Sequence, residues 1–146
     1  MLDFQKILKK DSYKKLSFKI SKTQHLLLKA KINGIEGKFI LDTGASSSCV
    51  GTESIEKFKL KAQNCSTKAS GAGATGIKTQ IAKNNLLQLG SWKMKKYPVI
   101  IFDLSHVNEA LLQHNAKPVD GIIGADVLLS GKAIIDYASK LLFLKG

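Results

Sequence analysis

The sequence contains no arginine, so all 23 of its basic residues are lysines, and with 11 acidic residues the net charge is +12. Arginine supplies the planar, bidentate contacts with which many proteins read bases and grip phosphates. Its absence therefore counts against nucleic-acid binding as the main function. Nine of the lysines nevertheless fall within residues 1–31. This segment allows two interpretations: a patch for nucleic acid or an acidic membrane, or a solvated lysine-rich surface.

Cysteine and proline are scarce too, with two residues of each. Cys49 and Cys65 lack the spacing and the nearby histidine pair of a zinc site, so we expect two free thiols, no metal and no cofactor. His25, His106 and His114 are scattered along the chain and are interpreted as ordinary surface or satisfied histidines.

Long apolar runs are absent, and none approaches the roughly 18 residues of a membrane-spanning helix. The first residues also lack the basic-then-apolar layout of a secretory signal. Together these absences predict a cytoplasmic protein that does not associate with membranes.

Short apolar runs dominate the rest of the chain, and its 12 glycines indicate many turns. This pattern predicts many short strands and little helix, and hence an all-β domain built as a compact barrel or sandwich. We expect one such domain over residues 24–146, preceded by a basic arm or short helix over residues 1–23. Strands are expected at 16–20, 26–32, 35–41, 47–50, 64–68, 77–82, 85–90, 92–96, 98–102, 132–137 and 140–144, and short helical segments at 52–58, 103–115 and 125–129.

The most informative stretch is Phe39–Ser46, which reads FILDTGAS. Its apolar half predicts a buried strand, entered through a hairpin turn at Asn33-Gly34, because both positions of such a turn favour positive φ. Asp42 then stands at the end of the strand, where Gly44 allows a tight turn. We expect its carboxylate to be partly buried there, a setting in which acid–base chemistry becomes possible. The plain alternative is an Asx turn in which Asp42 bonds only its own backbone.

A second unusual stretch, Ala69–Gly76, contains three glycines. One interpretation is a loop that cradles phosphate, but no Lys-Ser or Lys-Thr follows in Walker spacing and no Rossmann acidic residue fits. The other, which we prefer, is the tip of a mobile β-hairpin. Glycines let such a tip open, close and approach the backbone of a ligand.

A single aspartate cannot carry out hydrolysis with two carboxylates, in which one takes a proton from water while the other gives a proton to the amide. No second Asp-Thr-Gly or Asp-Ser-Gly occurs in the chain, since Asp120-Gly121 lacks the hydroxyl residue and the other downstream aspartates lack the glycine. A symmetric dimer would supply the second group, because Asp42 of each chain would meet its twin at the two-fold axis.

Taken in order, these parts resemble the retropepsin-like aspartic proteases, in particular the single-domain prokaryotic type of the pepsin clan. The match spans about residues 24–145. Its five elements are the hairpin and active-site stretch Ile32–Ser46, a glycine-rich flap at Ser70–Gly76, Asp120–Gly124, a short helix at Ala125–Leu129, and Ile135–Tyr137. The resemblance implies a retropepsin-like β-barrel, closed or partly open, with one or two short helices and a flap hairpin. It also implies an aspartic endopeptidase that works as a homodimer on peptides or proteins.

The resemblance implies roles for individual residues as well. Asp42 would be the catalytic carboxylate, Thr43 would hydrogen-bond across the two-fold axis, and Gly44 would shape the turn and offer its N–H near the carboxylates. The substrate would contact the active-site loop and the flap, and a later segment would brace that loop from behind. The substrate-contacting residues would be Ala45, Ser70, Gly71, Ala72 and Gly73, and the bracing residues Ile122, Ile123 and Gly124.

Two further features bear on the resemblance. Ala45 is the residue that retropepsins commonly have after Asp-Thr-Gly, and it withholds a hydroxyl that pepsins have at this position, which fits a less acidic pH optimum. Viral retropepsins follow the bracing segment with an arginine-bearing helix that supports the dimer, and this chain has no arginine.

Two other functions stay open at this stage. The same fold could serve as a peptide-binding or dimerisation module with little or no turnover. Alternatively, residues 1–31 could bind nucleic acid, which would show as a steep salt dependence of binding.

Overall fold

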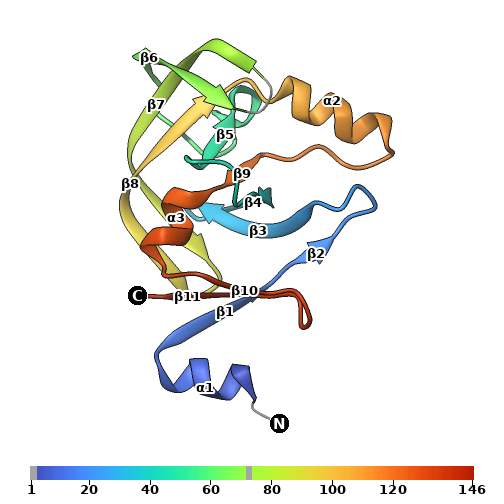
Figure 1. Ribbon diagram of the computed structural model, residues 1–146. Coiled ribbons are helices and arrows are strands. Elements are labelled where there is room, and N and C mark those ends of the chain that lie inside the picture. Colours follow the sequence, from blue (N-terminus) through green and yellow to red (C-terminus); the bar gives the residue numbers. More distant parts are fainter. Residues whose placement is uncertain (1–2, 72–73) are drawn as a thin grey trace.

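The computed structural model of the chain describes residues 3–71 and 74–146, with side chains for residues 3–64 and 79–146. Strands make up about half of it, and the helices are short (Figure 1). The elements in chain order are α1 (Phe4–Lys10), β1 (Tyr13–Ser17), β2 (Lys19–Ile20), β3 (Leu26–Ile32), β4 (Ile35–Leu41), β5 (Cys49–Gly51), η1 (Thr52–Ser54), β6 (Gln63–Gly71), β7 (Ala74–Leu89), β8 (Trp92–Phe102), α2 (Ser105–Gln113), β9 (Gly121–Ile123), α3 (Ala125–Ser130), β10 (Ile134–Asp136) and β11 (Leu141–Lys145).

A closed barrel forms the body of the molecule. Eight strands make one sheet in the order β2-β3-β4-β9-β5-β8-β7-β6, and a further pairing of β3 with β7 closes the ring from β3 to β7. Strand β9 lies between β4 and β5, parallel to the first and antiparallel to the second. The prediction of an all-β barrel with short helices is therefore confirmed.

The hairpin of β3 and β4 forms as the Asn-Gly pair predicts. Asn33 has φ of 53° and Gly34 has φ of 83°, the two positive values that a tight hairpin turn requires. The Asn33 side chain also donates to the carbonyl of Phe58 and to Oδ1 of Asn85, both at 2.9 Å. The turn is thereby fixed to the neighbouring elements as well as to its own strands.

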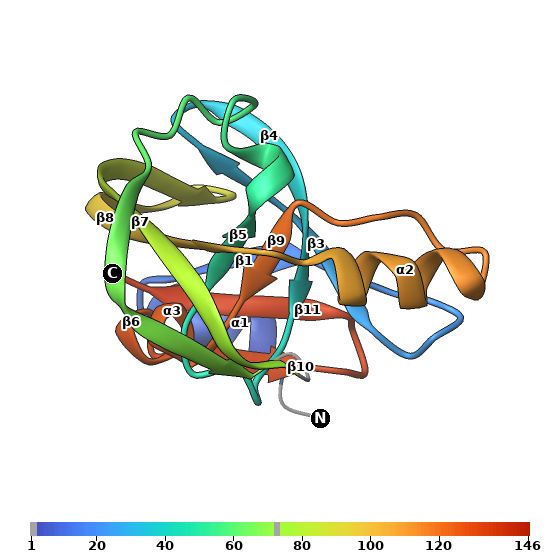
Figure 2. The ribbon, with the colours of Figure 1, turned by 90° about the horizontal axis from the view of Figure 1, so that it is seen from above.

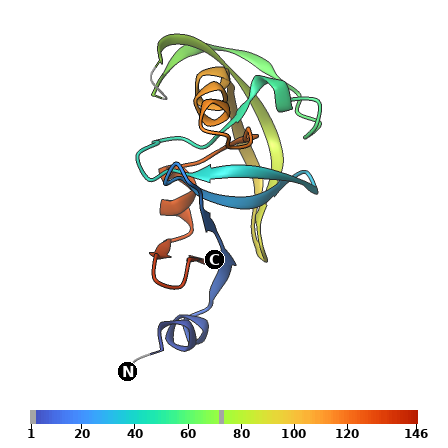
Figure 3. The ribbon, with the colours of Figure 1, turned by 90° about the vertical axis from the view of Figure 1, so that its right-hand side faces the viewer.

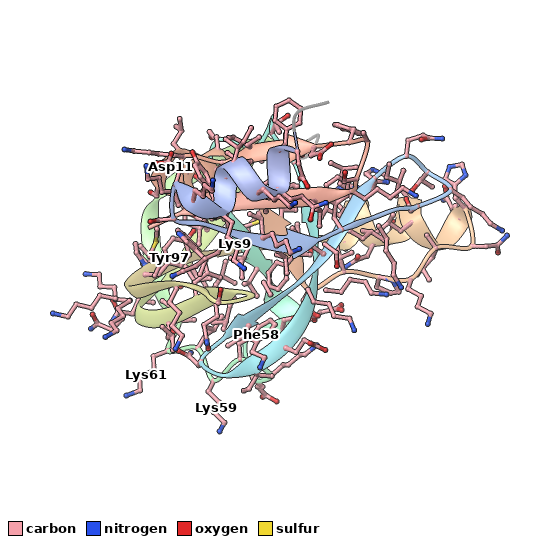
Figure 4. All side chains as sticks on the ribbon, turned by 90° about the horizontal axis from the view of Figure 1, so that it is seen from below. Lys9, Asp11, Phe58, Lys59, Lys61 and Tyr97 are labelled. Atoms are coloured by element: carbon pink, nitrogen blue, oxygen red, sulfur yellow. The ribbon has the colours of Figure 1, made fainter. Side chains whose placement is uncertain are left out.

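One predicted helix is shorter than expected. The segment 52–58 makes only the single 3₁₀ turn η1, followed by irregular turns that end at Lys59 with φ of 56°. The ring of Phe58 is fully buried and packs on Phe39 with ring centroids 6.1 Å apart. Burying this ring takes precedence over continuing the helix. Figure 4 shows Phe58 inside the fold, with the labelled Lys59 and Lys61 pointing outward.

A second sheet, in the order β1-β11-β10, lies below the barrel in Figure 1. Strand β1 comes from the segment expected to be an N-terminal arm, and it pairs with β11 from Tyr13↔Lys145 to Ser17↔Leu141. Helix α1 precedes it and has no buried residue. The division of the chain at residue 23 stays a prediction that truncation can test.

The apolar core has two parts. The larger cluster fills the barrel and includes the fully buried Phe39, Leu87 and Ile123. The smaller cluster lies between the barrel and α2 and consists of Ile40, Cys49, Phe102, Leu104, Leu111, Val119 and Ile122. Within the part of the chain that the structure describes, no helix has the length and apolar character needed to cross a membrane.

Candidate active site

Asp42 lies directly after β4, at the start of a loop of residues 42–48 that we call the active-site loop. Its N–H donates to the carbonyl of Ile123 at 2.9 Å, which continues the pairing of β4 with β9 by one step. One carboxylate oxygen, Oδ1, accepts the N–H of Gly44 at 2.8 Å, and the main-chain carbonyl accepts the N–H of Ala45 at 3.2 Å. The Asx-type bond that was expected if Asp42 bonds only its own backbone is thus present, but it occupies only Oδ1.

The carboxylate of Asp42 is exposed in the single chain, as are Thr43 and Gly44. The expectation that it is partly buried is therefore wrong for one chain alone. The reason is that the active-site loop turns outward from the barrel, so only its backbone is covered. Any desolvation of this carboxylate must come from a second chain or from a bound ligand.

The segment from β9 into α3 packs behind the active-site loop. A Cβ placed on Gly124 would stand 2.6 Å from the carbonyl oxygen of Ala45, so only glycine allows this close approach. The same carbonyl accepts the N–H of Ala125 at 2.7 Å, and the carbonyl of Ser46 accepts the N–H of Asp126 at 3.2 Å. Ile122 and Ile123 pair with β4 and β5 immediately before this contact. These residues make the contacts that a brace would make, and that role stays a prediction.

A buried hydrogen-bond network fixes the far end of the loop, and we call it the Asp126 tether. Oδ1 of Asp126 accepts both the N–H and the Oγ–H of Ser48, at 2.8 and 2.6 Å. Oδ2 accepts the hydroxyl of Tyr97 at 2.7 Å, and Oγ of Ser48 accepts the N–H of Gly124 at 2.7 Å. The tether therefore joins the loop, α3 and β8. Sequence reasoning noticed Asp126 but assigned it no role, because its partners are 78 and 29 positions away.

Burial and the tether together change the chemistry of Tyr97. Burial disfavours its phenolate, and the hydrogen bond to Asp126 adds to that effect, so the pKa of Tyr97 lies well above its ordinary value. Its hydroxyl accordingly stays a donor at all pH values where the protein would work. The residue is structural in this arrangement, with its ring against the barrel core.

The carboxylate of Asp120, like that of Asp126, accepts hydrogen bonds from other parts of the chain. Its carboxylate accepts the N–H of Lys38, the Oγ–H of Ser54 and the ammonium of Lys57, each at 2.9 Å. Burial by itself would raise the pKa of Asp120, but these bonds, led by that from Lys57, outweigh it and leave the pKa below its usual value. Asp120 and Asp126 are therefore both committed to structure, and neither is placed to act as a second catalytic acid.

The glycine-rich hairpin is formed by β6 and β7. Pairing runs from Gln63↔Ile81 to Gly71↔Ala74, with two irregularities on the way, so Ser70 and Gly71 lie at the end of β6. The predicted contact residues Ala72 and Gly73 lie outside the described residues. Seen from the side in Figure 3, this hairpin and the loop that follows β4 extend in the same direction from the barrel.

Among residues 3–64 and 79–146, whose side chains the structure describes, no group of three histidine, cysteine or acidic side chains is placed to hold a metal ion. Cys49 is a buried free thiol on β5, and burial raises its pKa to about 12. The loop therefore presents the carboxylate of Asp42 together with the exposed hydroxyls of Thr43, Ser46 and Ser47.

Comparison with known proteins agrees with this geometry. The family model described as aspartyl protease matches residues 28–127, which include the active-site loop, the hairpin and β9. No curated protein is significantly similar to the chain in sequence.

The fold is shared with many solved structures, of which three are described here. A retropepsin-like aspartic protease from Rickettsia conorii superposes with a TM-score of 0.60 at 20% identity, covering 90% of this chain and 89% of that one. The retroviral protease-like domain of Ddi1 from Leishmania major gives 0.57 at 17% identity, with coverage of 82% and 87%. The EIAV protease complexed with the inhibitor HBY-793 gives 0.53 at 18% identity, with coverage of 76% and 91%. At these identities the likeness is one of fold.

Proposed function

The chain belongs to the retropepsin-like aspartyl protease family, and from this premise we propose that it is an aspartic endopeptidase that works as a homodimer. The observation that carries the proposal is the exposure and the hydrogen bonding of the Asp42 carboxylate. Its carboxylate is exposed at the end of a buried strand, and Oδ1 alone is engaged, by the Gly44 N–H of the same loop. The loop backbone is fixed from behind at both ends, so this carboxylate is presented in one orientation.

The proposed chemistry needs two Asp42 carboxylates, one from each chain. Two such groups about 3 Å apart hold one proton between them. The ionised group takes a proton from water as the water oxygen attacks the peptide carbonyl carbon, and the protonated group gives its proton to the carbonyl oxygen. Collapse of the resulting diol breaks the C–N bond while a proton passes to the amide nitrogen. The products are an acid and an amine, and the pair again holds one proton.

Other loop residues support this chemistry in the proposal. The hydroxyl of Thr43 would bond across the two-fold axis, and the N–H of Gly44 already holds Oδ1. Extended substrate would lie between the active-site loop, through Ala45, and the β6–β7 hairpin, through Ser70, Gly71, Ala72 and Gly73. Strand-type backbone bonds would hold it there. The active-site loop would be held in place from behind by Ile122, Ile123 and Gly124.

The surface around the loop supports the dimer. Leu129 on α3 is 78% exposed and Tyr137 after β10 is 62% exposed, and Ile134 on β10 is 39% exposed. In Figure 3, α3 and the turn after β10 lie on the same side of the molecule as the active-site loop. Exposed apolar side chains of this size beside a functional loop are typical of a surface that another chain covers. Covering it would also desolvate Asp42.

The test is cleavage of a mixed peptide library by wild type and by Asp42→Asn, from about pH 3.5 to 7.5 and over a range of enzyme concentrations. We expect cleavage by wild type that rises faster than linearly with concentration, because the active species is a dimer, and none by Asp42→Asn. Asp3→Asn changes an exposed aspartate that caps α1 and is the matched control. Cleavage by Asp42→Asn would refute the proposal. No cleavage by a correctly folded, dimeric wild type would point instead to a peptide-binding module.

A further inference from the structure

A groove of about 670 Å³ lies between the segment 22–25 and helix α2. This segment leads from β2 into β3, and α2 connects β8 to β9. In Figure 1 both project from the right-hand side of the barrel, and in Figure 2 they project on the same side again. The lining residues are Lys22, Thr23, Gln24, His25, His106, Val107, Ala110, Leu111 and His114.

All three histidines of the chain line this groove, although they are separated by up to 89 positions in sequence. They were interpreted from the sequence as scattered, but the fold brings them to one place. They do not hold a metal in the described part of the chain, because no three potential ligands there have the required geometry. The imidazoles are instead spread along the two walls, His25 on one and His106 and His114 on the other.

The lining is basic. Lys22 contributes an ammonium group, and no aspartate or glutamate lines the groove. Glu109, the acidic residue of α2, is not among the lining residues. Imidazole N–H groups and ammonium groups donate hydrogen bonds, and they do so most strongly to carboxylates. The composition therefore favours an anionic group over a neutral or cationic one.

His25 is held in a defined orientation. Its Nδ1 lies 2.6 Å from Oγ1 of Thr23, which in turn lies 2.7 Å from Oγ of Ser21, and Oγ of Ser21 accepts the N–H of His25 at 3.1 Å. Because Nδ1 is occupied by this chain of bonds, Nε2 is the ring nitrogen left for a ligand. A ring fixed in this way loses little freedom when it binds.

The groove lies next to the active-site loop and shares an apolar cluster with it. His25 precedes Leu26, which is the register partner of Leu41, so His25 and Asp42 are the next residues along the two paired strands. On the opposite wall, Leu111 belongs to the smaller apolar cluster and Val107 packs against it, as does Ala45 of the active-site loop. An extended peptide advances about 3.3 Å per residue, so one lying over Asp42 reaches the groove within a few residues.

We propose that this groove is a specificity subsite that binds an acidic side chain of the peptide substrate, a few residues from the scissile bond. The inference rests on the proposed function, since it assigns a substrate class to the same site. The apolar floor of Val107, Ala110 and Leu111 takes the methylene groups of a glutamate, and Lys22 and the imidazoles take its carboxylate.

The first experiment measures cleavage of matched peptides that differ only by Glu or Gln at each position around the cut site. For wild type we expect kcat/KM to be about tenfold higher for the Glu peptide at one position, as one charge-assisted bond would give. A triple variant combines Lys22→Gln, His106→Gln and His114→Gln. In this variant we expect the ratio of kcat/KM for the Glu peptide to kcat/KM for the Gln peptide to fall toward one. Lys93→Gln, an exposed lysine on β8, keeps the ratio of wild type. Equal cleavage of Glu and Gln peptides by wild type at every position would overturn the inference while leaving the protease intact.

The second experiment does not depend on turnover. Asp42→Asn protein is titrated with acetyl-tetraglutamate amide or acetyl-tetraglutamine amide, and the ring signals of the three histidines are followed by NMR. We expect saturable shifts of all three with the acidic peptide and none with the neutral one. Shifts that are absent, or equal for both peptides, would overturn the inference. Shifts of Asp42→Asn with the acidic peptide, combined with a wild type that cleaves no peptide in the first experiment, would support the groove and refute the proposed function.

Discussion

At the scale of single residues, the side chains that the site exposes differ from the side chains that hold the loop in position. Asp42 and Thr43 are exposed, whereas the side chains that fix the far end of the loop are buried or half-buried. Asp126 is the clearest of these supports, because it accepts three hydrogen bonds from two distant parts of the chain. Its contribution is to the position of the loop, and it can be measured separately from catalysis.

Replacing Asp126 with alanine removes the acceptor of three of the four hydrogen bonds in the tether. Ser48 is 4% exposed and Tyr97 is 7% exposed, so their donors would be left buried without partners. We expect a loss of about 2–4 kcal/mol in the free energy of unfolding, measured by urea denaturation. Tyr97→Phe deletes one bond only and should cost about 1 kcal/mol. Asp136→Ala, which removes an exposed turn bond to Ser139, is the control and should change little. A loss from Asp126→Ala no larger than that control would show that the tether carries no stability.

Cys49 gives the protein a characteristic response to alkaline pH. Burial raises the pKa of the folded thiol from 9.0 to about 12, so the unfolded chain releases its proton first. The stabilising contribution of the protonated thiol is therefore fully present below pH 9. As the pH rises toward 12, the free energy of unfolding falls by about 1.4 kcal/mol per pH unit. Between pH 8.5 and 10.5 we expect a protein with Cys49 to lose about 2 kcal/mol more than Cys49→Ala. Both proteins carry Cys65→Ala, so that Cys49 is the single thiol, and equal losses would contradict the shift.

The parts of the site that could be predicted from sequence are the local ones. Asp42, Thr43 and Gly44 are adjacent, and the turn they make depends on their own conformations and on the strand before them. The tether of Ser48, Tyr97 and Asp126 has no such local signal, because three separate elements must pack before its members meet. The exposure of Asp42 was missed for a related reason: burial of a strand says nothing about whether the loop after it is covered.

At the scale of elements, the strand pattern was predictable because alternation and turn residues are short-range properties. The Asn33-Gly34 turn, β3 and β4 have the boundaries that the sequence predicts. Strand β8 runs through Pro98, where two strands were expected, since a proline costs only one ladder bond. The groove beside α2 had no sequence signal, because its two walls, residues 22–25 and 106–114, are far apart in the chain.

Truncation separates the roles of α1 and β1. Helix α1 buries no residue, and the ion pair of Asp11 with Lys145 is exposed, so deleting residues 1–11 should cost less than about 1 kcal/mol. Deleting residues 1–23 also removes β1 and the buried ring of Phe18, which is 3% exposed. We expect that deletion to cost at least about 3–5 kcal/mol in urea denaturation, as does loss of a buried phenylalanine.

Phe18→Ala in the full chain tests the same element without shortening it. Its expected cost is also about 3–5 kcal/mol. If the chain lacking residues 1–23 is as stable as the chain lacking residues 1–11, the N-terminal segment is an independent arm and the predicted boundary at residue 23 holds. If it is markedly less stable, β1 belongs to the domain.

At the scale of the whole molecule, the proposed catalysis requires a second copy of the chain. The chain carries one Asp-Thr-Gly, and the carboxylates of Asp120 and Asp126 are engaged in structural hydrogen bonds. The proposed dimer would bring the exposed Leu129, Ile134 and Tyr137 together around the axis. This chain has no arginine, so the proposed dimer would need other contacts in place of the arginine-bearing helix of viral retropepsins. The exposed apolar side chains are the candidates for that support.

Leu129→Glu tests this surface directly. Leu129 is 78% exposed, so the substitution should leave the fold of one chain intact, but in a symmetric dimer it places two charges in the interface. Burying one leucine stabilises by about 1.5–3 kcal/mol, and two copies double the effect, so the dimer Kd should rise at least about 100-fold in sedimentation equilibrium. Cleavage per chain should fall at low concentration and recover as concentration rises, because Asp42 itself is unchanged. Leu112→Glu, on the 56%-exposed leucine of α2, is the matched control and should dimerise like wild type. A Leu129→Glu protein with the Kd of wild type would move the two-fold axis away from α3 and β10, and would require another surface to bring the two Asp42 carboxylates together.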